Sequence, residues 1–214
     1  MEAHQPHWSP DGKQIAFMAV YPDSRYKMCL ISPDGGEYQE VFPGGGQEGA
    51  PTWSKDGKKL VYGDVFSRQD SSNMSIHVFD LTSRNASTLP QSSGLWSPRW
   101  SPDGRYISAV AVGSPPAVLL YDCTSQKWTR LATVDTIDDE PTWSGDSAYI
   151  YFISSDSGLS RYYRVRIGDG RTEPLISLPG NSLDPWGGVT PDGVPLVSRI
   201  NRVQEIYAMH VEWP

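Results

Sequence analysis

A short motif, written Pro-x-Trp-Ser-Pro-Asp-Gly in its fullest form, returns five times in this sequence of 214 residues. The five copies are Pro6–Gly12, Pro51–Gly57, Pro98–Gly104, Pro141–Ser147 and Val189–Gly193. Their aspartates are Asp11, Asp56, Asp103, Asp146 and Asp192, and an apolar residue follows each one four positions later. A period of about 45 residues indicates that one supersecondary unit is repeated along the chain.

Each unit has the pattern of four short strands joined by turns. The first strand carries the tryptophan, and the Asp-Gly pair predicts a tight turn into a second strand such as Tyr149–Ile153. Third strands are predicted at Tyr26–Ile31, Ser75–Leu81, Val118–Tyr121, Tyr162–Ile167 and Glu205–Val211, and fourth strands at Glu40–Phe42, Ser87–Leu89, Trp128–Leu131 and Glu173–Ile176. No stretch has helical periodicity over three turns.

This pattern predicts an all-β fold, a β-propeller of about five four-stranded antiparallel blades. We expect a single domain over residues 1–214, with repeats at approximately 3–46, 47–92, 93–136, 137–181 and 182–214. Only nineteen of twenty strands can be counted, because the last unit ends after its third strand. If Ala3–Gln5 pair with Glu205–Val211, the N-terminus closes the ring. Otherwise the last blade is incomplete, and its open edge invites self-association.

The repeated residues of the motif are expected to be structural. A tryptophan in every unit suits packing between blades, since it buries a large apolar area. The motif Ser and Asp are expected to form the turns. A catalytic group is needed once in an enzyme, whereas a packing group is needed in every blade.

The motif resembles the TolB-type propeller repeat, also described as WD-like. The first and third units match it almost letter for letter. Departures are Lys55 in the second unit, Gly145 and Ser147 in the fourth, and Val189 at the tryptophan position of the fifth. The resemblance implies a propeller and covers nearly the whole chain. Members include periplasmic translocation proteins, non-catalytic propellers of serine peptidases and C-terminal propellers of bacterial regulators.

Family members more often carry six or more blades. The resemblance therefore leads us to expect the C-terminal part of a longer bacterial protein, with a compact five-blade ring as the alternative. The regulator likeness rests on the closing stretch from Pro195 to Ala208. Two cysteines fit a periplasmic or a cytoplasmic location equally.

Composition excludes several classes of function. The longest apolar run, Ile15–Tyr21, is too short to cross a bilayer, so no membrane insertion is expected, and no signal peptide pattern opens the sequence. The net charge of the chain is −7, so the sequence shows no sign of the cationic surface that a nucleic-acid binder needs. Cys29 and Cys123 form neither a disulfide framework nor a zinc site by their spacing.

No catalytic residue, cofactor or metal is expected. The sequence has no Gly-x-Ser-x-Gly elbow, and Ser155, Ser157 and Ser160 have no histidine near them in sequence. The four histidines lack metal-ligand spacing, although some lyases with this fold use histidine clusters. Gly44–Gly46 leads to no helix and so offers no phosphate site.

Recognition is the remaining function. Loops between consecutive blades gather at one face of a propeller, and here they are acidic and aromatic. The candidate binding residues are Glu48, Trp96, Asp138, Asp139, Glu140, Asp184 and Trp186. We expect this face to bind a protein or peptide that carries basic residues, or to bind another cation. Trp96 and Trp186 are expected to anchor the partner. A solvated charged loop without a partner is the other interpretation.

The sequence thus predicts a non-enzymatic binding or scaffold propeller that serves as the sensor or interaction part of a larger bacterial protein. Two alternatives stay open. One is a propeller associated with an enzyme, a serine peptidase of the prolyl oligopeptidase type or a lyase. The other is a TolB-like envelope protein.

Overall fold

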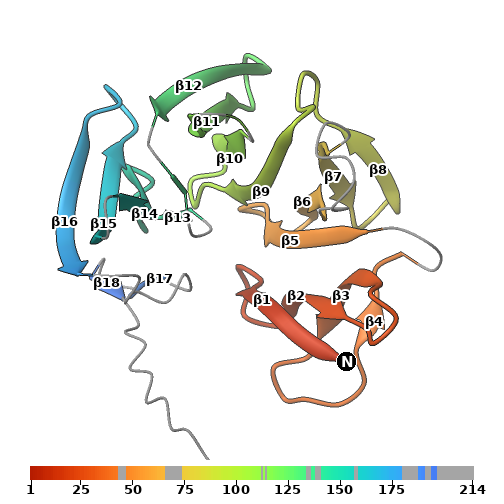
Figure 1. Ribbon diagram of the computed structural model, residues 1–214. Helices are drawn as coiled ribbons and strands as arrows, with labels where there is room; N and C mark the ends of the chain where they lie inside the picture. Colours follow the sequence, from red (N-terminus) through yellow and green to blue (C-terminus); the bar gives the residue numbers. More distant parts are fainter. Residues whose placement is uncertain are drawn as a thin grey trace, which may run out of the picture.

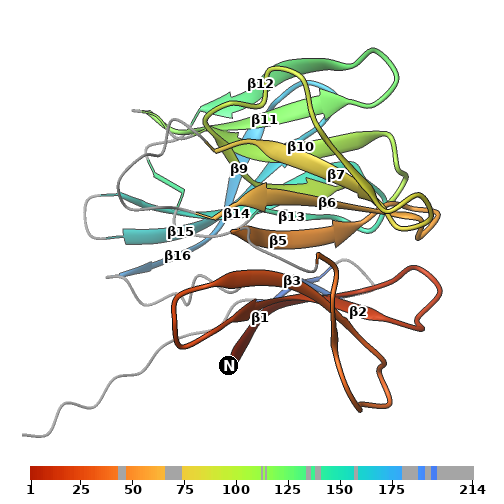
Figure 2. The ribbon, with the colours of Figure 1, turned by 90° about the vertical axis from the view of Figure 1, so that its right-hand side faces the viewer.

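The chain forms four-stranded antiparallel sheets arranged around a central axis in a computed structural model (Figure 1). The structure describes residues 1–42, 47–65, 74–111, 113, 115–133, 136–137, 141–156, 159–179, 188–190 and 194–196. Seen from the side, the sheets of the first three blades are stacked one on the next (Figure 2).

Each blade is a meander whose strands follow one another in sequence. Blade 1 consists of β1 (Glu2–Trp8), β2 (Ile15–Val20), β3 (Tyr26–Ile31) and β4 (Gln39–Glu40). Blade 2 consists of β5 (Glu48–Trp53), β6 (Lys59–Asp64), β7 (Ile76–Asp80) and β8 (Asn85–Thr88). Blade 3 consists of β9 (Leu95–Trp100), β10 (Tyr106–Ala111), β11 (Ala117–Asp122) and β12 (Lys127–Thr133). Blade 4 consists of β13 (Thr142–Trp143), β14 (Tyr149–Asp156), β15 (Leu159–Arg166) and β16 (Thr172–Pro179).

The predicted all-β propeller is confirmed, with a small difference in blade count. Four blades are complete, where about five were expected. The fifth repeat contributes the two-stranded sheet of β17 (Gly188–Val189) and β18 (Pro195–Leu196). Its predicted third strand, Glu205–Val211, lies outside the described residues.

The N-terminal residues considered for ring closure form part of blade 1. Ala3 pairs with Ala19 and His4 with Met18, so Ala3–Gln5 belong to β1, the inner strand of that blade. Their predicted partner, Glu205–Val211, lies outside the described residues, so the predicted pairing stays a prediction.

The Ser and Asp of the motif build the same turn in all four complete blades. In blade 4, the Ser144 hydroxyl donates to the Asp146 carboxylate at 2.6 Å and accepts from the Tyr149 backbone N–H at 2.9 Å. The Asp146 carboxylate in turn accepts from the Ala148 N–H at 3.0 Å. The hydrogen bond from Ser144 is the main reason that the pKa of Asp146 is lowered. The motif therefore fixes the turn that joins the first two strands of each blade.

The proline of the motif lies at a β-bulge that faces the axis. In blades 1, 2 and 3 the residue before this proline, Gln5, Ala50 or Ser97, has a φ of 53°, 55° or 49°. The strand register shifts at the same places. Proline lacks a backbone N–H and is tolerated at edges and bulges, and each inner strand has one edge free toward the axis. Three non-glycine residues are thus held in a conformation that costs free energy.

The three largest buried apolar clusters lie between consecutive blades, and two smaller ones lie within blades 1 and 4. One buried cluster joins Met28 of blade 1 to Leu60 and Phe79 of blade 2. A second joins Ile76 of blade 2 to Ile107 of blade 3, and a third joins blade 3 to blade 4. Each blade is therefore stabilised by its neighbours, as expected for a repeat protein.

The four motif tryptophans do not all have the packing role predicted for them. Trp53 and Trp143 are buried between blades, at 8% and 9% exposure. Trp100 is half-buried, and its indole N–H donates to Gly104 O in its own turn at 3.2 Å. Trp8, by contrast, is 60% exposed. Trp100 also packs against the apolar cluster between blades 2 and 3. The prediction is therefore correct for these three tryptophans and wrong for Trp8.

Candidate functional site

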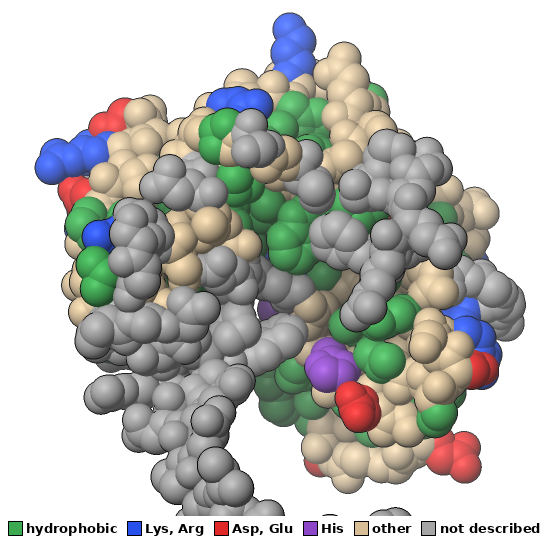
Figure 3. All heavy atoms as spheres, in the orientation of Figure 1, with side chains coloured by type: hydrophobic (Ala, Val, Ile, Leu, Met, Phe, Trp, Pro, Cys, Tyr) green, Lys and Arg blue, Asp and Glu red, His purple; other side chains and the backbone are tan. Residues whose placement is uncertain are grey.

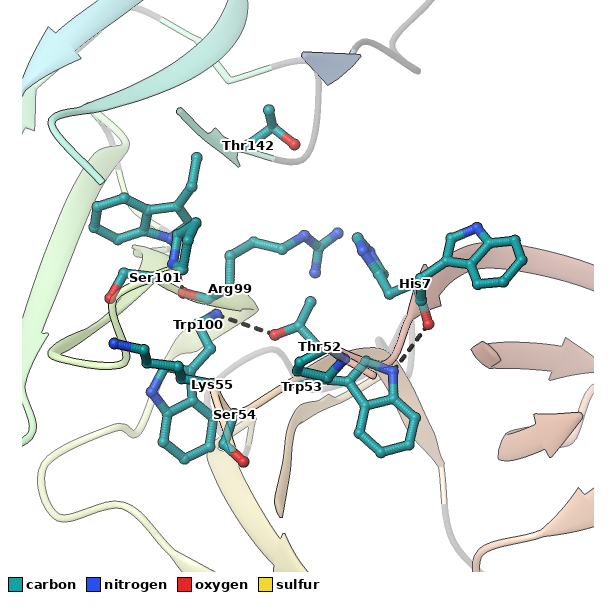
Figure 4. Close-up of a pocket in the computed structure, with 13 residues that line it drawn as sticks. His7, Thr52, Trp53, Ser54, Lys55, Arg99, Trp100, Ser101 and Thr142 are labelled. Carbon is teal, nitrogen blue, oxygen red and sulfur yellow. Dashed lines mark hydrogen bonds between the residues drawn. The ribbon is translucent and has the colours of Figure 1, made fainter. Parts of the chain in front are cut away.

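A pocket of about 410 Å³ opens on the axis among the inner strands. Its floor is formed by the residue between proline and tryptophan in each motif, which we call the axial position. The axial residues are His7 of β1, Thr52 of β5, Arg99 of β9 and Thr142 of β13. Figure 4 shows these four side chains directed toward the space between the blades. We refer to this site as the axial pocket.

Indole hydrogen bonds hold the backbone of the axial residues in place. The Trp53 Nε1–H donates to the carbonyl oxygen of His7 at 2.9 Å, and the Trp143 Nε1–H donates to that of Arg99 at 3.0 Å. Each bond runs from one blade to the blade before it. The Trp100 backbone N–H also donates to the Thr52 hydroxyl at 3.0 Å (Figure 4). The same residues that join the blades thus position the pocket floor.

Arg99 supplies a buried positive charge to the axial pocket. Arg99 is 4% exposed, and its guanidinium donates to the carbonyl oxygens of Pro98 at 2.9 Å and Ala50 at 3.4 Å. In Figure 4 the guanidinium points toward the His7 imidazole. Burial, and after it the charge of Arg99, lowers the pKa of His7 to about 3. His7 is therefore neutral at physiological pH, while Arg99 stays charged.

The wall of the axial pocket is aromatic with one further cation. It contains Trp8, Trp53, Trp100, Trp143 and Lys55. Ser54 and Ser101 also line it, but their hydroxyls donate to Asp56 and Asp103 in the motif turns. Cationic and hydroxyl groups surrounded by indoles suit the binding of a carboxylate that carries an apolar neighbour.

A second, smaller pocket of about 130 Å³ lies at the opposite end of the inner strands β1, β5 and β9. It is lined by the three bulge residues and by side chains of neighbouring strands. The lining residues include Gln5, Met18, Asp64, Val65, Trp96 and Ser97. On the face shown in Figure 3, hydrophobic side chains lie near the centre, and most Lys, Arg, Asp and Glu side chains lie toward the rim.

Two of the seven residues predicted to bind a partner lie in the described part of the chain. Trp96 is half-buried in β9 and lines the smaller pocket. Glu48 does not lie in an exposed loop as expected. It begins β5, is 7% exposed, and its carboxylate lies 3.9 Å from the Lys27 ammonium of blade 1. Burial raises the pKa of Glu48, opposed by the Lys27 charge.

The other five predicted residues, Asp138, Asp139, Glu140, Asp184 and Trp186, lie outside the described residues. Within the described ranges, no group of three or more His, Cys, Asp or Glu side chains could hold a metal ion. The part of the chain that the structure describes contains no helix with the length and apolar character of a membrane span.

The axial residues were missed by the sequence reasoning, which treated the whole motif as structural. A signal was present, because the axial position holds His, Thr, Arg and Thr while the tryptophan after it is the same in four units. A position that varies inside a repeated motif does not form the repeated turn, and is therefore a candidate for recognition.

Comparison with known proteins gives relatives of the same architecture. The chain is 25% identical to TolB from Acinetobacter baumannii, with a TM-score of 0.71, over 90% of this chain and 47% of that one. A protein of Agrobacterium tumefaciens described as a TolB matches with 21% identity and a TM-score of 0.74, over 93% of this chain and 74% of that one. The second likeness shows the fold alone.

An uncharacterized protein of Agrobacterium fabrum is 23% identical over 194 residues, which cover 90% of this chain. The chain spans 64% of the length of that relative. A family model described as the TolB beta propeller domain matches residues 20–212, which is most of the sequence. The chain therefore belongs to the TolB beta propeller domain family.

Proposed function

We propose that this propeller is a binding module for a protein or peptide, and that the axial pocket recognises an acidic group of the partner. One observation supports this most directly: the motif positions that repeat build the frame, whereas the position that varies converges on the pocket. The relatives are bacterial, and a role as the interaction part of a larger bacterial protein belongs to the same proposal.

The chemistry of the axial pocket favours a carboxylate. Arg99 supplies a charge that burial leaves poorly screened, and Thr52 and Thr142 add hydroxyl groups. The indoles of Trp53 and Trp143 give an apolar surface for the residue beside that carboxylate. A pocket of about 410 Å³ is within the usual size of ligand sites.

The test compares two probes that differ in one group. These are the acetylated and amidated pentapeptide Gly-Leu-Asp-Leu-Gly and its Asn analogue, titrated against the protein and followed by NMR. We expect the Asp peptide to bind roughly tenfold tighter, as for a hydrogen bond to a charged group. Arg99→Gln should remove this difference, while Arg105→Gln, on an arginine whose side chain is 60% exposed, should keep it.

Equal affinities of the two peptides for the native protein would contradict the proposal. If Arg99→Gln does not fold, Thr142→Val and Lys55→Gln each remove one polar group from the pocket and provide the same comparison. Retention of the full Asp preference in both variants would also reject the axial pocket as the site.

A second candidate face is the acidic and aromatic set of loops predicted from the sequence. We propose that it contacts a basic partner through Asp138, Asp139, Glu140, Asp184 and Trp186. The observation in its favour is that Trp96, predicted as an anchor, lines a pocket together with the Asp64 carboxylate. Buried Glu48 would act there through its pairing with Lys27 rather than by direct contact.

A further inference from the structure

The smaller pocket has closely fitted walls. A side chain at Gly49 would place its Cβ 2.5 Å from Val65 Cγ2 and 3.0 Å from Met18 Sδ. A Cβ at Gly63 would lie 3.2 Å from Pro98 Cδ. Both glycines line the pocket, so a Cβ would clash with Val65 at Gly49 and would crowd Pro98 at Gly63. The cavity that remains is large enough for one side chain and too small for a peptide backbone.

The pocket presents hydrogen-bond acceptors without a cation. Ser97 is 3% exposed, and its hydroxyl oxygen has no hydrogen-bond partner among the described residues. The Asp64 carboxylate is held by the His77 imidazole at 3.1 Å and by the Ser75 backbone N–H at 2.9 Å. None of the described lining residues is Lys or Arg. A buried hydroxyl without a partner costs free energy unless a ligand completes its hydrogen bonding.

The backbone is strained at the same place. Gln5, Ala50 and Ser97 all line the pocket and all have positive φ before a proline. Such a conformation costs free energy, so the surrounding fold must enforce it. Strained residues of this kind often accompany binding sites. Here the strain lies where three blades meet at one end of the axis.

We propose that this pocket binds the side chain of a single lysine from a partner protein, and we call it the lysine slot. The aliphatic stem lies along Trp96 and Met18, and the ammonium group bonds to Asp64 and Ser97. A compact ammonium with three donors suits this set of acceptors, whereas a planar guanidinium needs more of them. An apolar side chain would leave the Ser97 hydroxyl buried and unpaired. The Trp96 indole adds a cation–π surface.

This assignment rests on the proposal that the acidic face binds a basic partner, and it names the residue type of that partner that the pocket would recognise. The probe is N-acetyl-lysine N-methylamide, compared with the norleucine analogue, which keeps the stem and lacks the amine. NMR follows the indole N–H of Trp96, identified by its disappearance in Trp96→Phe. We expect a saturable shift with the lysine probe and roughly tenfold weaker binding of the norleucine probe.

Two variants and one control separate the slot from a general charge effect. Asp64→Asn and Ser97→Ala should each weaken binding of the lysine probe and leave the norleucine probe unchanged. Asp34→Asn removes the same charge from an exposed turn and should have no effect. If Asp64→Asn does not fold, binding of the lysine probe by Ser97→Ala alone decides the test.

Equal binding of the two probes, or full lysine binding by Ser97→Ala and Asp64→Asn, would overturn the slot. The proposed functions are tested apart from it, because the acidic pentapeptide reports on the axial pocket. If binding of a basic partner depends on Asp138–Glu140 but the lysine probe does not bind, the acidic face is retained and the lysine slot is rejected.

Discussion

At the scale of single residues, the motif contains positions that form the turns and one position that lines the axial pocket. The Ser hydroxyl and Asp carboxylate form the same hydrogen bonds in four blades, at 2.6–2.7 Å between the two side chains. The axial residue, two positions before the serine, is His in blade 1, Thr in blades 2 and 4, and Arg in blade 3. The turn-forming residues and the residue that lines the pocket are therefore neighbours in one short segment.

Replacing a motif serine should destabilise its blade. Ser144→Ala removes the donor to Asp146 and the acceptor for the Tyr149 N–H in a buried position. We expect the free energy of unfolding to fall by about 1–2 kcal/mol, measured by urea denaturation. Ser125→Ala, at an exposed turn, is the control and should change it by less than about 0.5 kcal/mol. Equal losses would show that the turn bonds are not the cause.

The lowered pKa of His7 predicts a specific pH dependence of stability. Because the folded protein keeps His7 neutral down to a pKa of about 3, the unfolded chain binds a proton near pH 6.5 that the folded chain does not. Stability contributed by this difference is complete above pH 6.5 and is lost as the pH falls toward 3. His7→Gln should therefore lose less stability than the native protein between pH 7 and pH 5, measured by urea midpoints. The same loss in both proteins would contradict the assigned cause.

At the scale of elements, consecutive blades are joined by apolar clusters and by single indole hydrogen bonds. Trp53 and Trp143 each donate to an axial carbonyl of the preceding blade. Trp8, in the first described blade, is exposed and has no such role among the described contacts. A motif tryptophan is therefore expected to contribute more to stability where its indole donates to the preceding blade than where it is exposed.

Two matched substitutions measure this difference. Trp53→Phe removes the hydrogen bond to His7 O and part of a buried side chain, so we expect a loss of about 1–3 kcal/mol in the free energy of unfolding. Trp8→Phe changes an exposed indole and should cost less than about 0.5 kcal/mol. Thermal denaturation of the two variants gives the comparison. A loss for Trp8→Phe that equals the other would mean that Trp8 is also packed.

The blades could be predicted from sequence because their cause is local. The Asp-Gly turn, the apolar residue at +4 and the spacing of about 45 residues each report on one unit. The axial pocket could not be predicted in this way, since it arises only when residues such as His7 and Arg99 from different blades meet. Burial of Glu48 was missed for a related reason, because its partner Lys27 belongs to another repeat.

At the scale of the whole molecule, charge is unevenly distributed. The chain has a net charge of −7, yet the axial pocket contains Arg99 and Lys55. The acidic loop residues were predicted at the face formed by connections between blades. The predicted acidic face and the cationic axial pocket would attract partners of opposite charge, and such long-range attraction depends on ionic strength.

Neutralising the predicted acidic loop tests this distribution. Asp138→Ala, Asp139→Ala and Glu140→Ala combined should weaken binding of a basic peptide such as pentalysine and make its affinity less dependent on salt. Isothermal titration at several salt concentrations measures both effects. The control, Arg105→Gln, alters an exposed charge in the turn between β9 and β10 and should preserve the salt dependence. Unaltered binding by the triple variant would show that the loop is only solvated.

The variable axial position has an evolutionary consequence. Each blade contributes one side chain to the floor of the axial pocket, and that side chain forms none of the Ser–Asp turn bonds that secure its blade. Mutations there can accumulate one blade at a time, and duplication or loss of a blade changes the whole combination in a single genetic event. A lineage of such propellers can therefore vary the lining of this pocket while the turns that hold each blade are inherited unchanged.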